Sequence, residues 1–124
     1  MDLNNPVIKL CIESTQAEFE GEIETARQLS MQAWELSKDD FDGCVAAHYV
    51  ARYQEDAEQR LHWDMEALDR AKAVEDDRVK EFYPSLYLSL GHSYELLGNG
   101  SESERYYNLV AELGVVHQPV SQPK

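Results

Sequence analysis

The side chains best suited to chemistry in this chain of 124 residues are few and far apart. The four histidines are His48, His62, His92 and His117. The sequence contains no H-E-x-x-H, G-x-S-x-G or P-loop signature, and no Cys-x-x-Cys pair. His48 and His92 could meet Glu95 in a metal or acid–base site if the two histidines lay on equivalent helices. Packed or solvated histidines are the simpler interpretation, so the sequence predicts no enzyme, no metal and no cofactor.

The charge balance restricts the partners of the protein. Asp and Glu total 24 against 11 Lys and Arg, which gives a formal net charge of −13. Nucleic acids and anionic membrane surfaces attract basic proteins, so both are disfavoured as partners. A basic or neutral protein partner is electrostatically easier, although an acidic surface also serves solubility.

Cysteine usage and hydropathy indicate a cytoplasmic protein. Cys11 and Cys44 each lie in an apolar run and are expected to be free, buried thiols. The first residues lack the basic and apolar regions of a signal peptide. No apolar run approaches the roughly 20 residues of a membrane span.

The apolar residues recur at helical spacing along almost the whole chain, which predicts an all-α fold. Val, Ile and Thr are sparse, whereas Ala, Leu, Glu, Gln and Arg, which favour helices, are abundant. The expected helices cover residues 6–20, 22–36, 40–53, 57–74, 78–97 and 101–113. Residues 1–114 would form the helical domain, and 115–124 a flexible C-terminal tail.

Capping residues mark several of the expected helix ends. Asn5 before Pro6 is typical of a helix start. Pro84 predicts either a kink in the fifth helix or a true start at Tyr83. Ser101 with Glu104 matches a capping box for the last helix.

Small residues and turns repeat along the chain at nearly fixed spacing. Positions in the first helix pair align with positions 34 residues later in the second pair, for example Ala33 with Ala67. Positions in the second pair align with positions 43 residues later in the third pair, for example Ala67 with Val110. The third set contains Leu90-Gly91, Tyr94, Gly98, Tyr107 and Ala111, and the first contains Gly21 and Ala26.

This pattern resembles the tetratricopeptide repeat (TPR) family, with a longer third repeat like those of some bacterial regulators and of kinesin light chain. The resemblance implies an α-α superhelix, or solenoid, of three antiparallel helix pairs over 6–36, 40–74 and 78–114. His48 and Arg60 depart from it, because the family prefers small residues there. A shift of one residue would place Ala47 at the contact instead.

The resemblance further implies a concave groove, lined by the first helix of each pair, that binds a peptide or partner helix. The residues expected to line this groove are Tyr49, Arg52, Tyr53, Ser85, Ser89, His92 and Glu95. Tyr and Arg are enriched in binding hot spots, which favours this interpretation. Packing between repeats is the alternative role for the tyrosines, and it is preferred for Tyr94 and Tyr107.

Self-association is the competing function. Ile8, Cys11, Ile12 and Phe19 would form an exposed apolar strip on the first pair, which could bind a partner or a second copy. The alternatives are that three units curve tightly enough to bury this strip, or that the tail covers it. The expected end of the last helix at Gly114 also has no further helix to cover it, so a homodimer through the apolar end helices is a second possibility.

Overall fold

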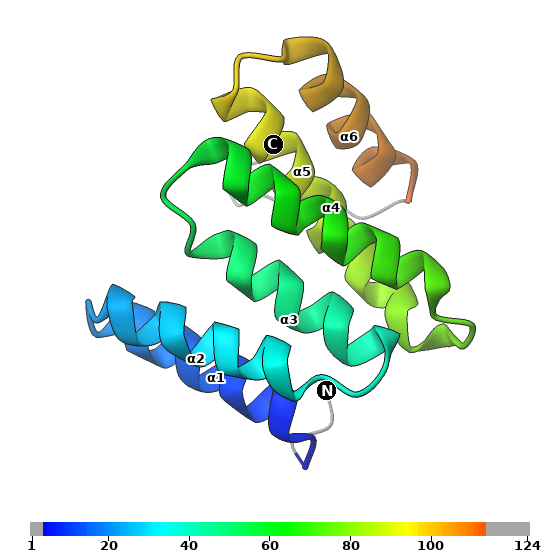
Figure 1. Cartoon of the computed structure of the whole chain (residues 1–124). Coiled ribbons are helices and arrows are strands. Elements are labelled where there is room, and N and C mark those ends of the chain that lie inside the picture. The colour runs from blue at the N-terminus through cyan, green and yellow to red at the C-terminus, as the bar shows by residue number, and fades with distance from the viewer. Residues whose placement is uncertain (1–3, 114–124) are drawn as a thin grey trace, which may run out of the picture.

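The computed structural model describes residues 4–113 of the chain, and these form helices joined by short connections (Figure 1). The α-helices are α1 (Pro6–Phe19), α2 (Ile23–Leu36), α3 (Asp40–Arg52), α4 (Ala57–Ala73), α5 (Tyr83–Leu96) and α6 (Gly100–Glu112). A 3₁₀ segment, η1 (Asp77–Phe82), precedes α5. The predicted all-α class is therefore confirmed. The expectations for Gly114 and the tail 115–124 lie outside the described residues.

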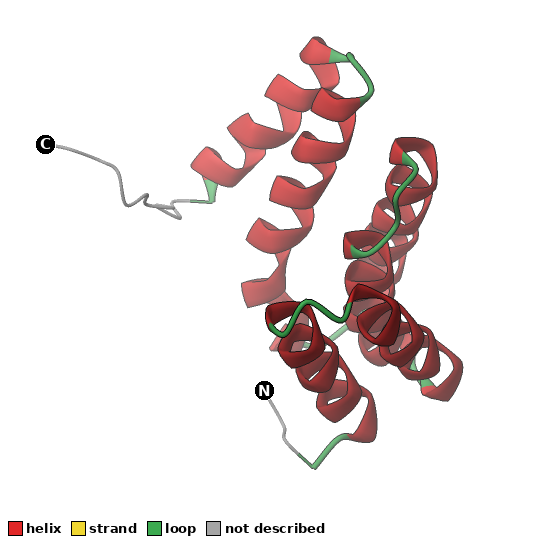
Figure 2. Ribbon diagram, turned by 90° about the vertical axis from the view of Figure 1, so that its left-hand side faces the viewer, coloured by secondary structure: helices red, strands yellow, loops and turns green. Residues whose placement is uncertain are grey.

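The six α-helices of residues 4–113 pack as three consecutive pairs, α1 with α2, α3 with α4 and α5 with α6. The second helix of each pair also contacts the first helix of the next, α2 on α3 and α4 on α5. Figure 1 shows the pairs following one another from the blue to the orange end, and Figure 2 shows the same helices and their short connecting loops after a quarter turn. This is the arrangement of a solenoid-like helical repeat.

Most predicted helix ends are confirmed. The Asn5 side chain accepts a hydrogen bond from the Val7 N–H at 2.8 Å, with Pro6 as the first helical residue. Gly21 and Gly98 have φ values of 79° and 77°, which a residue with a Cβ rarely adopts. They reverse the chain after α1 and α5.

The predicted capping box at the last helix is wrong. Helix α6 begins at Gly100, so Ser101 is already inside its first turn. Asn99 caps the helix instead, because its side-chain oxygen accepts from the Glu102 N–H at 3.2 Å.

Of the two alternatives that Pro84 predicts, the structure shows a helix start at Tyr83. The 3₁₀ segment η1 stops at Phe82, and α5 starts at Tyr83 with the proline in its first turn, where the missing N–H removes no helical bond. This segment places the Phe82 ring edge-on against the His48 ring, with centroids 5.1 Å apart.

Small side chains allow the paired helices to approach closely. Ala47 is fully buried with Ala67 and Ala71 of α4, as expected from a one-residue shift away from His48. In the third pair the Tyr107 ring lies over Gly91. Tyr94 stacks on Tyr106 with an interplanar angle of 8°. Tyr94 and Tyr107 therefore do serve packing.

No helix within residues 4–113 is both long and apolar enough to cross a lipid bilayer.

Candidate functional site

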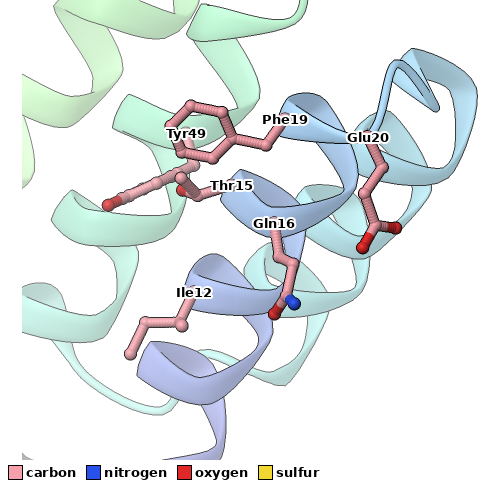
Figure 3. Close-up of a pocket in the computed structure, with 6 residues that line it drawn as sticks. All are labelled: Ile12, Thr15, Gln16, Phe19, Glu20 and Tyr49. Carbon is pink, nitrogen blue, oxygen red and sulfur yellow. The ribbon is translucent and has the colours of Figure 1, made fainter.

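Three adjoining pockets lie on the surface formed by α1, α3, α4 and α5, and we call this surface the groove. The first, the apolar pocket, has a volume of about 560 Å³ and is lined by Ile12, Thr15, Gln16, Phe19, Glu20 and Tyr49. All but Tyr49 come from α1 and its C-cap, so the pocket lies where α1 faces α3. Figure 3 shows the rings of Phe19 and Tyr49 at one end of it and Ile12 at the other.

The apolar strip expected on α1 is only half exposed. Ile8 and Cys11 are buried against α2 and α3, in a cluster with Ala33 and Val45. The expectation that these two residues contact a partner is therefore wrong. Ile12 and Phe19 do face outward, with 44% and 87% of their surface exposed.

Tyr53 does not line the groove, contrary to the sequence-based expectation. It is 4% exposed and packs with Ala17 and Ala26 between the first two pairs. Its hydroxyl lies 3.4 Å from the Ser14 Oγ and 3.3 Å from a Glu18 oxygen. Tyr53 is the C-cap of α3 and its side chain is buried, so its role is packing.

The second pocket, the polar pocket, has a volume of about 260 Å³. It is lined by His48, Arg52, Arg60, Ser85, Leu88, Ser89 and His92. These side chains come from α3, the first turn of α4, and α5. Four of the seven residues expected in the groove, Arg52, Ser85, Ser89 and His92, are thus brought together here, and a fifth, Tyr49, lines the apolar pocket.

A third, smaller pocket of about 230 Å³ connects the other two. It is lined by Thr15, Glu18, Phe19 and Arg52. Glu18 accepts from the Arg52 Nε at 2.8 Å, so an ion pair between α1 and α3 forms its wall. This pocket shares Thr15 and Phe19 with the apolar pocket and Arg52 with the polar pocket, so the three pockets follow one another along the groove.

A buried carboxylate supports the polar pocket from below. Asp64 of α4 is almost fully buried, and its two oxygens accept from the Ser89 Oγ at 2.7 Å and the Ser93 Oγ at 2.5 Å. Burial raises the pKa of Asp64, and the two serine hydrogen bonds only partly oppose this rise. These bonds fix α5 on α4 and so hold the pocket wall in place.

His48 is held neutral at physiological pH. Burial, together with the nearby charges of Arg52 and Arg60, lowers the pKa of His48 to about 4. Its Nδ1 is shielded from solvent and has no hydrogen-bond partner within residues 4–113.

The metal or acid–base site considered for His48, His92 and Glu95 is not assembled. The two histidines share the polar pocket, but Glu95 accepts a hydrogen bond from the Tyr107 hydroxyl of α6 at 2.9 Å and does not line it. Among the described residues, no group of three His, Cys, Asp or Glu side chains could hold a metal ion.

Two residues of the polar pocket region escaped the sequence analysis as site residues, Arg60 and Asp64. The available signal was the repeat itself, since Arg60 stands where the repeat pattern calls for a small residue. By itself that departure predicts only a wider or shifted pairing of the helices, whereas the structure places Arg60 at the pocket wall.

Comparison of the chain with protein-family models, with curated proteins and with solved structures finds no match. The resemblance to the TPR family therefore stays a prediction from the sequence pattern.

Proposed function

We propose that the protein is a non-catalytic interaction module of TPR type that binds a peptide or partner helix in the groove. The observation that carries the proposal is the row of three adjoining pockets across α1, α3 and α5, with Phe19 87% exposed at its apolar end. A solvated phenylalanine next to an apolar pocket is a typical anchor for a protein contact.

The chemistry of the groove changes along its length in a way that suits a polypeptide. Its first part offers Ile12, Phe19 and Tyr49 for an apolar side chain, and its second part offers hydroxyl, imidazole and guanidinium groups. An extended segment or a helix presents apolar and polar side chains at this kind of spacing. The buried thiols of Cys11 and Cys44 suit a cytoplasmic site of action, where thiols remain reduced.

Selection of displayed random 12-residue peptides on the full chain tests the proposal, with affinities of the selected peptides measured by fluorescence anisotropy. Ile12→Ala combined with Phe19→Ala should weaken binding at least tenfold, because both side chains line the apolar pocket. Ile23→Ala is the matched control, since Ile23 is 42% exposed against 44% for Ile12 but lies outside the groove. Equal binding by all three proteins would refute the groove as the binding site.

Self-association through the same apolar residues is the second candidate, supported by the exposure of Ile12 and Phe19. Sedimentation velocity over a range of concentrations separates the two functions. A dimer that dissociates in the Ile12→Ala, Phe19→Ala protein, together with no selected peptides, would assign the apolar pocket to a second copy of the chain. A monomer at high concentration would remove this candidate.

A further inference from the structure

Arg60 differs from every other arginine in the described part of the chain. Within residues 4–113, Arg27, Arg52, Arg70, Arg78 and Arg105 each form an ion pair with a carboxylate. Arg60 forms neither an ion pair nor a hydrogen bond there, and its Nε is shielded from solvent. This is unexpected in a chain with 24 acidic residues, where a partner for an arginine is easily supplied.

The polar pocket that Arg60 lines contains no carboxylate. Its other polar members are two histidines, two serines and Arg52, whose charge is taken up by Glu18 at 2.8 Å. Asp64 attracts Arg60 and His92 through space, but its oxygens accept hydrogen bonds from Ser89 and Ser93. Arg60 therefore lines the pocket without a hydrogen-bonded acceptor among the described residues.

We propose that the polar pocket binds one oxyanion group, a carboxylate or a phosphate, carried by the segment that occupies the groove. This inference rests on the proposed function and specifies the chemistry of the partner. Arg60 supplies the charge and a forked pair of donors, and His92 and the Ser85 hydroxyl supply further donors from α5.

The energetic reason is the state of Arg60 without a ligand. A guanidinium partly withdrawn from water and without an acceptor has lost hydration that no protein group replaces. An oxyanion in the pocket would restore those hydrogen bonds, and a volume of about 260 Å³ accommodates a carboxylate or phosphate group.

The local chemistry thus differs from what the whole chain suggests. A net charge of −13 favours a basic or neutral partner at long range. At the pocket the balance is reversed, because its lining includes two arginines and no carboxylate. We therefore expect an acidic group placed a few residues from the apolar anchor that enters the Phe19–Tyr49 end of the groove.

Matched peptides test the inference. The tightest selected 12-residue peptide is synthesised with Glu, phosphoserine or Gln at its acidic position, and each is titrated by anisotropy into the wild-type protein and Arg60→Gln. Replacing Glu by Gln should weaken binding to the wild type about tenfold or more and leave binding to Arg60→Gln unchanged. The Glu and phosphoserine peptides distinguish the two sources of the oxyanion. Arg105→Gln, an exposed arginine of α6 outside the groove, should behave as the wild type does.

A Glu-to-Gln effect of the same size in Arg60→Gln, or none in the wild type, would overturn the inference while leaving peptide binding intact. If no peptide is selected, the proposed function fails, and the pocket is tested directly with inorganic phosphate and acetate. Saturable shifts of the Arg60 Nε–Hε and His92 resonances in NMR spectra of the full chain would support the oxyanion site, and unchanged resonances would refute it. If Arg60→Gln folds poorly, Arg60→Lys takes its place in the titration. This variant keeps the charge but not the forked pair of donors, so it should bind with intermediate affinity.

Discussion

Replacing Gly91 by alanine should destabilise the protein, although alanine is the better helix former. A Cβ at position 91 would lie 2.5 Å, 2.7 Å and 3.0 Å from three ring atoms of Tyr107. The ring is held over the glycine by the hydrogen bond from its hydroxyl to Glu95 at 2.9 Å. It must therefore rotate away or α6 must shift outward.

The size of the effect follows from two opposing terms. Overpacking of this kind costs about 1–3 kcal/mol. The change from Gly to Ala inside a helix returns about 1 kcal/mol. Because Tyr107 is half-buried and its ring can move toward solvent, we expect a net loss of about 1 kcal/mol, which corresponds to a fall in melting temperature of roughly 3–6 °C.

Urea denaturation of four proteins measures this balance: the wild type, Gly91→Ala, Tyr107→Ala and the double variant. In the Tyr107→Ala background the clash is absent, so Gly91→Ala should stabilise by about 1 kcal/mol and the effect should change sign. Gly100→Ala is the control, since a Cβ there meets nothing within 4 Å. A Gly91→Ala protein as stable as the wild type, or an effect independent of Tyr107, would refute the packing role of Gly91.

Four further predictions concern buried groups. Tyr53→Ala should cost about 3–5 kcal/mol in urea denaturation, as for other buried aromatic residues, whereas Tyr53→Phe should bind selected peptides as the wild type does. Because the pKa of Asp64 is raised in the folded state, its contribution to stability is fully present below the unfolded pKa and decreases as pH rises through the folded pKa. Asp64→Asn should therefore gain stability relative to the wild type as the pH rises from acidic to neutral. A stability difference that does not change with pH would contradict this. Burial raises the thiol pKa values of Cys11 and Cys44 to about 12, so both should react with a disulfide reagent only after unfolding, and rapid reaction of the native protein would be inconsistent with their burial. The imidazole of His48 should titrate in NMR spectra near pH 4, well below an exposed histidine.

The helical pairs could be predicted because their signals are local. Asn5 with Pro6, Gly21 and Gly98 each act on the backbone within a few residues, and all three mark helix ends in the structure. The last cap was predicted wrongly, since Asn99 and Ser101 are both suitable caps and lie two residues apart. Which of them bonds to a backbone N–H depends on the geometry of the turn.

The composition of the groove could be predicted only in part. The helical period predicts that Tyr49, Arg52, Ser85 and His92 share one face, since they lie on successive first helices, and each of them lines a pocket in the structure. It misplaced Tyr53, because this residue follows the end of α3 as its C-cap and its ring packs against α1 and α2.

The sequence by itself determined an acidic chain of three helical hairpins, because composition, apolar period and turn residues act within one element or between neighbours. The tertiary structure alone decided which charges remain unpaired. Arg60 and Asp64 lie one helical turn apart and look like a routine ion pair. Packing of α5 on α4 gives the Asp64 oxygens to Ser89 and Ser93 and leaves Arg60 facing the groove. Competition for a buried carboxylate is settled by groups far apart in the chain, and sequence spacing carries no information about it.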